Sequence, residues 1–296
     1  MRICVIFNPT AKGNKARRFR RQLQDIADRA ELRRTRSPGE ARLLAAVAVR
    51  DGFDAIVAAG GDGTVNEVLN GIGDAPDGFA RVWLGVLPLG TVNVFAKELG
   101  LPLHLGKAWD AIQNGQARAI DLARAEFTSG DKPRSRFFVQ MAGAGLDARA
   151  IELVDWKLKQ KIGQFAYLVA GLKAMKEPRS MIEVTSDAGT ARGELVLIGN
   201  GRFYGGKLPV FASASLTDGL LDACVFPRVN WLTILRYGLG LLAHRAPTPR
   251  DVQYLQAASF KLAAASPTPF EVEGETIGQV PATVSVRAKV LRVIVP

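Results

Sequence analysis

The stretch AAGGDGTVNEVLNG (Ala58–Gly71) places three glycines around one aspartate, directly after an apolar run. Glycine lets a phosphate approach the backbone closely, and the N-terminus of a following helix attracts anions. Thr64 and Glu67 have the S/T-x-x-E spacing of a capping box, so we expect Thr64 to cap that helix. The stretch has neither the Walker G-x-x-x-x-G-K-[ST] nor the Rossmann G-x-G-x-x-G pattern. It predicts another kind of phosphate cradle, and a purely structural turn stays the alternative.

Asp62 is an acid inside this anion cradle, where it would repel a phosphate unless a cation lay between them. That combination favours a magnesium nucleotide. A second loop, LPLGTVNVFA (Leu87–Ala96), repeats the order of strand, glycine and helix, and FNPTAKGNK (Phe7–Lys15) ends the first apolar run similarly. Loops that follow parallel strands meet at the edge where open α/β sheets bind ligands. The three loops together predict a nucleotide site.

The elements that must position these loops alternate between strand and helix patterns. Strands are expected at Arg2–Phe7, Glu31–Ser37, Asp54–Gly60 and Val82–Gly90, and helices at Ala16–Ala30, Pro38–Gly52, Thr64–Ile72 and Thr91–Leu99. Such alternation predicts an α/β domain with a doubly wound parallel sheet.

After about Asp121 the pattern changes to frequent strands. They are expected within Phe137–Gly145, Met181–Ser186, Gly193–Gly201, Leu220–Phe226, Ser259–Ala265, Pro269–Glu275 and Ala282–Ala288, and two helical stretches at about Asp147–Lys176 and Trp231–Ala243 interrupt them. The polar segment Thr128–Arg136 predicts an exposed hairpin loop or a linker. We therefore divide the chain into an α/β nucleotide-binding domain over 1–123 and a β-rich domain over 124–286.

Length, net charge and composition limit the classes of protein to which this chain can belong. The chain has 296 residues, a formal net charge of +11 and 48% hydrophobic residues, so it can bury a sizeable core and suits an anionic partner. No stretch reaches the roughly 20 apolar residues of a membrane span, and the first residues do not resemble a signal peptide. Cys4 and Cys224 lie in apolar runs, which predicts buried thiols in a reducing cytoplasm.

Seven blocks of sequence carry a resemblance to one family. They are FNP at Phe7–Pro9, GGDGTVNEVLNG at Gly60–Gly71, LPLGTVNVFA at Leu87–Ala96, GAGLDA at Gly143–Ala148, GNGRFYGGK at Gly199–Lys207, TDGLLD at Thr217–Asp222 and EGE at Glu273–Glu275. The chain resembles the diacylglycerol kinase catalytic family of bacterial lipid kinases, which is related to sphingosine kinases and more distantly to NAD kinases and phosphofructokinases. The resemblance implies two domains with ATP in the cleft between them, a β-sandwich second domain, and a C-terminal strand (287–296) that returns to the first domain.

The resemblance also implies site residues. ATP contacts are expected from Asn8, Thr35, Gly60, Gly61, Asp62, Gly63, Thr64, Val65, Asn66, Glu67, Gly90, Thr91 and Asn93. The family's structural Mg²⁺ site falls here on Asp218, with backbone carbonyls near Ser215 and Leu220, and oxygen ligands suit this ion. A hairpin turn explains the same residues equally well.

Phosphoryl transfer to an alcohol needs a group that takes the hydroxyl proton. The two histidines, His104 and His244, lie outside the matched blocks, and His104 is expected in a surface loop. The base is therefore expected to be a carboxylate. The family's Asp-Gly-Glu corresponds here to Glu273-Gly274-Glu275, which makes Glu275 the expected general base and Glu273 an orienting residue. Asp62 of the glycine-rich loop is the third catalytic candidate.

The chain departs from the family pattern at two positions in the loops. Val94 stands where many members have Asp, and Lys12 where glycine is frequent. Neither change removes the glycine-rich loop, so we expect an active enzyme.

Basic residues gather in Lys15–Gln24 and, mixed with apolar residues, in Trp156–Lys176. A lipid kinase must take its substrate from a bilayer, and such segments suit an anionic surface. Ordinary solvated helix faces are the alternative. The expected partners are a lipid substrate and no nucleic acid, in a cytoplasmic protein; peripheral contact with the inner face of the membrane and a homodimer stay open.

The leading hypothesis is thus an ATP- and Mg²⁺-dependent lipid kinase acting on diacylglycerol or a related lipid. A soluble-substrate kinase such as an NAD kinase is the alternative within enzymes. A non-catalytic basic protein that binds nucleic acid or membrane is the alternative outside them, although no helix-turn-helix pattern or zinc spacing supports nucleic-acid binding.

Overall fold

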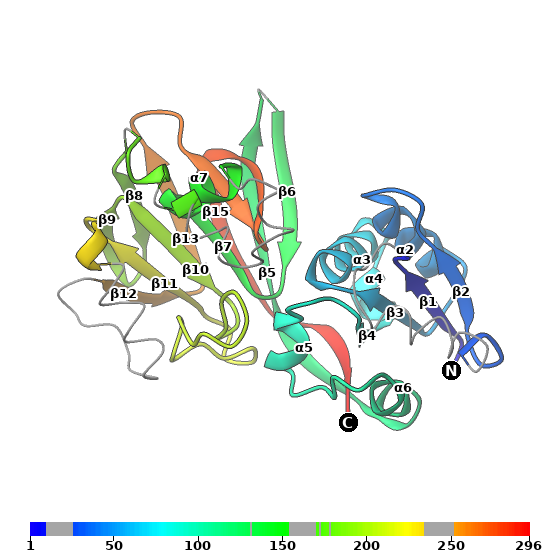
Figure 1. Ribbon diagram of the computed structural model, residues 1–296. Helices are drawn as coiled ribbons and strands as arrows, with labels where there is room; N and C mark the ends of the chain where they lie inside the picture. The colour runs from blue at the N-terminus through cyan, green and yellow to red at the C-terminus, as the bar shows by residue number, and fades with distance from the viewer. Residues whose placement is uncertain (10–25, 131, 154–169, 172, 178, 234–251) are drawn as a thin grey trace. The chain divides into compact units, whose positions relative to one another are not determined.

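The computed structural model describes residues 1–9, 26–130, 132–153, 170–171, 173–177, 179–233 and 252–296 (Figure 1). The chain forms two compact units. The first comprises Met1–Leu122, Gly205–Lys207 and Arg287–Pro296, and the second comprises Ala123–Tyr204 and Leu208–Val286.

The first unit is built on a parallel sheet, as predicted. Its strands are β1 (Ile3–Phe7), β2 (Glu31–Arg34), β3 (Ala55–Gly60) and β4 (Trp83–Pro88), in the order β2–β1–β3–β4. All three pairs are parallel. Strands β1 and β3 are buried along their whole length because helices cover both faces of the sheet. The end of β15 (Glu275–Val295) extends this sheet by pairing Val293 with Leu84.

The helices of this unit are α2 (Glu40–Arg50), α3 (Asp62–Asp74), α4 (Gly78–Arg81), α5 (Val94–Glu98) and α6 (Leu105–Asn114). Helix α5 begins three residues later than predicted, because Asn93 takes the left-handed conformation just before it. Helix α6 was not predicted. It packs Ala108, Trp109 and Ile112 into the same apolar cluster as Val57 and Leu87 of the sheet. His104 precedes α6 and is exposed, as expected.

The predicted capping box is wrong. Helix α3 begins at Asp62, so Thr64 lies inside its first turn, and Gly61 occupies the cap position without a side-chain hydrogen bond. The Glu67 carboxylate instead accepts the backbone N–H groups of Gly39 (2.9 Å) and Ala41 (3.1 Å) at the start of α2. Glu67 therefore caps a neighbouring helix rather than its own.

The second unit is a β-sandwich, which agrees with the predicted fold class. Its strands are β5 (Gln116–Ser129), β6 (Lys132–Phe138), β7 (Met141–Gly145), β8 (Ile182–Ser186), β9 (Gly189–Gly193), β10 (Leu195–Gly199), β11 (Leu221–Phe226), β12 (Gln253–Ala257), β13 (Ser259–Ala264), β14 (Pro269–Val272) and β15; the first residues of β5 and the last of β15 belong to the first unit. One layer has the order β12–β11–β10–β7–β14, and β9–β8–β13–β15–β5–β6 forms the other. Alternate residues of the first layer fill the core between the two layers, for example Ala142, Ile198 and Ala223.

The outer face of that first layer is also buried. Met141, Leu197 and Cys224 pack there with Leu146 and Ala150 of α7 (Leu146–Glu152). Both cysteines are free and buried, as predicted, and burial raises the pKa of the Cys4 thiol to about 12.

The segment that joins β5 and β6 differs from the loop predicted there. Strands β5 and β6 pair from Ala123↔Phe138 to Ser129↔Lys132, so most of the predicted polar loop at Thr128–Arg136 is strand. The basic stretch Lys15–Gln24 and most of the helical stretches at Asp147–Lys176 and Trp231–Ala243 lie outside the described residues. Within the described ranges, no helix is long and apolar enough to cross a membrane.

The crossing of α2 and α3 depends on Gly71. A Cβ added there would lie 2.1 Å from the Arg42 carbonyl oxygen and 2.8 Å from the Ala45 Cβ. We expect Gly71→Ala to lower the free energy of unfolding by about 1–3 kcal/mol, the usual cost of overpacking, as measured by urea denaturation. Gly106→Ala, in helix α6, is the matched control. Its added Cβ would meet nothing closer than 3.4 Å, so it should leave stability unchanged or raise it.

Candidate functional site

The loops predicted to hold a nucleotide meet at one edge of the first unit's sheet. The Asn8 N–H donates to the Ala59 carbonyl (3.1 Å), and the Thr35 N–H donates to the Phe7 carbonyl (2.9 Å). The Gly90 N–H donates to the Gly60 carbonyl (3.2 Å). Hydrogen bonds across the carboxyl ends of β1, β2, β3 and β4 thus place the residues that follow these strands side by side, as expected for a ligand site of an open α/β sheet.

The two glycine-containing loops touch one another closely. A Cβ added at Gly90 would lie 2.5 Å from the Gly61 Cα, and one added at Gly60 would lie 2.4 Å from Thr64 Oγ1. Asn93, at φ 52°, fixes the second loop, since its side chain accepts the Gly90 N–H (2.9 Å) and donates to the Gly90 carbonyl (2.7 Å). Glycine is therefore required at Gly90 by contact between the two loops, and at Gly60 by contact with the first turn of α3.

The first turn of α3 supplies the donors of this edge. The first N–H groups of a helix have no partner within it, and here they follow directly on Gly61. Thr64 Oγ1 lies 3.4 Å from Asn8 Nδ2, which joins this turn to the end of β1.

The predicted contact residues fall into two groups. Asn8, Thr35, Gly60, Gly61, Asp62, Gly63, Thr64, Gly90, Thr91 and Asn93 lie at or beside the strand ends. Val65 and Asn66 are buried within α3, and Glu67 is engaged with α2.

Asp62 has a contact that the sequence did not indicate. Its Oδ1 accepts the backbone N–H of Phe95 (3.3 Å) in the first turn of α5. Burial raises the pKa of Asp62, and the N–H groups of Phe95 and Val94 oppose that shift. The acid thus joins the first glycine loop to the helix after the second one, whatever else it binds.

In the second unit, the Glu273–Gly274 pair forms a two-residue turn between β14 and β15. Both residues have positive φ (54° and 79°), as in a type I′ hairpin. The Glu273 carboxylate accepts the backbone N–H groups of Val139 (2.8 Å) and Gln140 (2.9 Å). Glu273 therefore holds the turn against the segment between β6 and β7.

Glu275, the first residue of β15, is exposed and forms an ion pair with Arg136 of β6 (2.7 Å). Its side chain is thus accessible to a substrate, while a guanidinium fixes its orientation. Arg136 was not predicted as a site residue, because only the pairing of β5 with β6 and β15 brings it to Glu275.

Two further acids went unassigned, although both stand in or beside matched blocks. Glu271 is fully buried on β14, and Asp147 lies in the first turn of α7. The Tyr204 hydroxyl donates to Asp147 Oδ1 (2.7 Å). The strand pattern did not indicate this burial, because the apolar neighbours Phe270 and Val272 predict that Glu271 points to the opposite face of the strand.

The predicted metal ligands lie in the exposed turn between Ser215 and Leu220. Asp218 Oδ1 accepts the Leu220 N–H (3.0 Å), and Ser215 Oγ accepts the Thr217 N–H (3.3 Å). In the described part of the chain, no cluster of three or more His, Cys, Asp or Glu residues is arranged to hold a metal. A site here would rest on one carboxylate and backbone carbonyls, and that oxygen donor set fits Mg²⁺.

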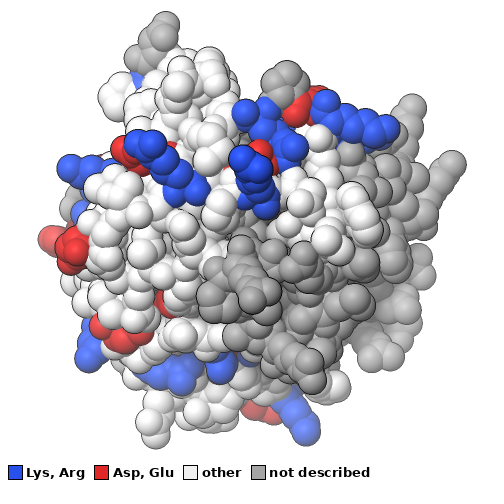
Figure 2. Space-filling model, turned by 90° about the vertical axis from the view of Figure 1, so that its left-hand side faces the viewer, with Lys and Arg blue, Asp and Glu red and all other residues white. Residues whose placement is uncertain are grey.

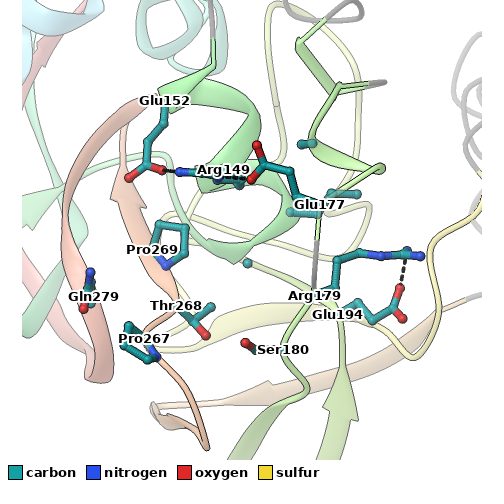
Figure 3. Close-up of a pocket in the computed structure, with 13 residues that line it drawn as sticks. Arg149, Glu152, Glu177, Arg179, Ser180, Glu194, Pro267, Thr268, Pro269 and Gln279 are labelled. Atoms are coloured by element: carbon teal, nitrogen blue, oxygen red, sulfur yellow. Dashed lines mark hydrogen bonds and ion pairs between the residues drawn. The ribbon is translucent and has the colours of Figure 1, made fainter.

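The second unit also contains a cavity of about 340 Å³ at the start of α7 (Figure 3). Its charged side chains face one another in pairs. Arg149 lies between Glu152 and Glu177, and Arg179 contacts Glu194. The lining holds three glutamates against two arginines, so one negative charge is in excess, and every charged side chain of the lining already belongs to an ion pair within it.

Figure 2 shows how charge is distributed over one face of the molecule. Lysine and arginine side chains are separated there by uncharged surface and by acidic residues, and the described residues of this face form no continuous basic band.

The contact between Asp62 and α5 can be tested by stability. We expect Asp62→Ala to lower the free energy of unfolding by about 1 kcal/mol, the usual cost of losing a carboxylate at a helix N-terminus. Asp62→Asn keeps an acceptor oxygen and should lose less. Thermal and urea denaturation measure the difference, with Asp110→Ala on the exposed face of α6 as the control. Equal stability of Asp62→Ala and the unaltered protein would refute the structural role.

Comparison with known proteins gives a consistent result. Residues 2–125 match the diacylglycerol kinase catalytic domain, and residues 140–295 match the YegS C-terminal NAD kinase beta sandwich-like domain. The diacylglycerol kinases of Bacillus subtilis (strain 168) and Staphylococcus saprophyticus are each 30% identical over 94% of this chain and 90% of their own length.

Solved structures share the fold. A diacylglycerol kinase from Bacillus anthracis str. Sterne superposes with a TM-score of 0.72 at 19% identity, over 100% of this chain and 97% of that one. Yeast NADH kinase complexed with NADH is more distant, with a TM-score of 0.57 at 10% identity over 99% and 82% of the two chains. From the domain matches and the full-length relatives, we conclude that the chain belongs to the diacylglycerol kinase catalytic-domain family.

Proposed function

We propose that this protein is an ATP- and Mg²⁺-dependent lipid kinase that transfers the γ-phosphoryl group to a hydroxyl of diacylglycerol or a related lipid. The observation that carries the proposal is the meeting of the Gly60–Gly61 and Gly90 loops at the carboxyl ends of β3 and β4. Membership of the diacylglycerol kinase catalytic-domain family supports the reaction type.

The α3 loop suits the phosphates of ATP. Its first-turn N–H groups are donors without partners in the helix, and the positive end of the helix favours anions. The glycines keep side chains away from this surface, so that a phosphate oxygen can reach the backbone.

Mg²⁺, when bound, neutralises the charge that develops on the transferred group. Asp62 lies at the phosphate loop, where it would help to hold a cation that accompanies the nucleotide. Ser215, Asp218 and Leu220 would hold a second, structural ion through oxygen atoms.

Glu275 is the proposed general base. Its exposed carboxylate is suited to take the proton of the lipid hydroxyl as that oxygen attacks the γ-phosphorus and ADP leaves. Arg136 would hold this carboxylate in one orientation through their ion pair. Glu273 would support it indirectly, since its carboxylate is occupied by the N–H groups of Val139 and Gln140.

The acceptor and the reaction are tested together. Purified protein is incubated with radiolabelled ATP, Mg²⁺ and vesicles that contain diacylglycerol, sphingosine, monoacylglycerol or phosphatidylglycerol, with NAD as a soluble competitor. We expect label in a lipid product and none in NAD. Folded protein that labels no lipid in the presence of Mg²⁺ would overturn the proposal.

The role of Glu275 is tested by Glu275→Gln. We expect kcat to fall by about 10²–10⁴-fold, the usual contribution of a general base, while thermal stability and the KM for ATP stay unchanged. Glu126→Gln, which alters an exposed acid on the neighbouring strand β5, is the matched control and should retain full activity. A change of only a few-fold in Glu275→Gln would exclude Glu275 as the base.

A further inference from the structure

Two carboxyl groups of the second unit are buried against one another. Glu271, on β14, is fully buried. Asp147, on α7, is half-buried as a residue, but its Oδ2 is shielded from solvent. A Cβ added at Gly143 would lie 2.7 Å from Glu271 Oε1 and 3.1 Å from Asp147 Oδ2. Both oxygens therefore crowd the same side of Gly143, where only glycine leaves them room.

The other oxygen of each group already has a donor. Asp147 Oδ1 accepts the Tyr204 hydroxyl (2.7 Å), and Glu271 Oε2 accepts the Gly274 N–H (2.7 Å). Asp147 Oδ2 and Glu271 Oε1 have no N–H or O–H donor among the described residues. Two buried acceptors without donors are costly, and one proton between them would satisfy both.

We propose that Glu271 is protonated and donates this proton to Asp147. A continuous chain of hydrogen bonds then runs from Tyr204 through the Asp147 carboxylate and the Glu271 carboxyl group to the Gly274 N–H. It joins the start of α7, the segment after β10 and the turn between β14 and β15.

The electrostatics identify Glu271 as the group that holds the proton. Burial raises the pKa of Glu271 well above its ordinary value, and the neighbouring acids Asp147 and Glu273 raise it further, against the Gly274 N–H. Burial also raises the pKa of Asp147, but hydrogen bonds from Tyr204 and Glu271 stabilise its charged form. The protonation of each carboxyl group depends on that of the other, as expected for two carboxyl groups in one buried site.

This series of hydrogen bonds ends at the Glu273–Gly274 turn, which directly precedes Glu275. By accepting the Gly274 N–H, Glu271 fixes the turn from which β15 starts, so Glu271 is a positioning residue for Glu275. This positioning role rests on the proposed function. The shared proton does not, and the two are tested by different measurements.

The shared proton predicts a pH dependence of stability. Folded Glu271 keeps its proton above pH 4.5, its ordinary pKa, whereas unfolded Glu271 releases it. Stability is thus complete below that value and falls as pH rises towards the folded pKa. One proton changes the unfolding equilibrium constant about tenfold per pH unit. Glu271→Gln carries an amide that donates to Asp147 and accepts from Gly274 at every pH, so it should stay folded and lose this dependence.

The measurement is urea denaturation of the unaltered protein and of Glu271→Gln between about pH 5 and about pH 9. We expect the unfolding equilibrium constant of the unaltered protein, divided by that of Glu271→Gln, to rise with pH. Asp147→Asn should also weaken the dependence, because it removes the neighbouring charge, and Glu126→Gln should not. Infrared spectroscopy should show a protonated carboxyl band that Glu271→Gln lacks. Parallel stability curves together with no such band would refute the shared proton.

The positioning role is measured by kinetics with the same variants. Glu271→Met removes the acceptor for Gly274, and it should lower kcat while leaving the KM for ATP unchanged. Glu271→Gln should restore kcat. If Glu271→Met folds and keeps full kcat, Glu271 does not position Glu275. If the unaltered protein phosphorylates no lipid, the proposed function fails while the pH experiment still decides on the proton.

Discussion

Carboxylates that accept backbone N–H groups from distant segments hold the loops of this protein in place. N–H groups at helix starts and in turns have no partner within their own element, and an ionised acceptor makes a stronger bond than a neutral one. Glu67 serves the start of α2, Asp62 the start of α5, and Asp121 the Lys289 N–H of the returning strand β15. These segments therefore depend on acids whose N–H partners lie 26 to 168 positions away in the chain.

The same constraint separates the roles of the acids around the β14–β15 turn. Phe270 and Val272 fill the sandwich core, so strand alternation points Glu271 to the opposite face, where Asp147 of α7 lies, and the turn leaves Glu275 exposed. Glu273 occupies a position with φ 54°, where asparagine or aspartate is more usual, and its longer side chain reaches two N–H groups of the neighbouring segment. Three acids within five residues thus have three environments, and only one of them is available to a substrate.

Much of the fold was predictable from local pattern. Buried parallel strands are continuous apolar runs, and this made β1, β3 and β4 recognisable. Helix α6 was missed, although Leu105, Trp109 and Ile112 have the spacing of an amphipathic helix and form the face that packs on the sheet beside β4. The capping box failed for a related reason. Thr64 and Glu67 have the right spacing, but the Glu67 carboxylate accepts backbone N–H groups at the start of α2 instead. No local pattern reveals this contact.

The glycine loops, the order of strands and helices, and the three acids of FEVEGE follow from residue types and spacing, because these features depend on neighbours along the chain. The pairing of Asp147 with Glu271, the ion pair of Arg136 with Glu275, and the contact of Asp62 with Phe95 join residues that are 33 to 139 positions apart. They depend on which strands lie side by side. Spacing reveals which groups are available for chemistry, whereas burial and long-range contact decide which of them carry a proton, hold a turn or face a substrate.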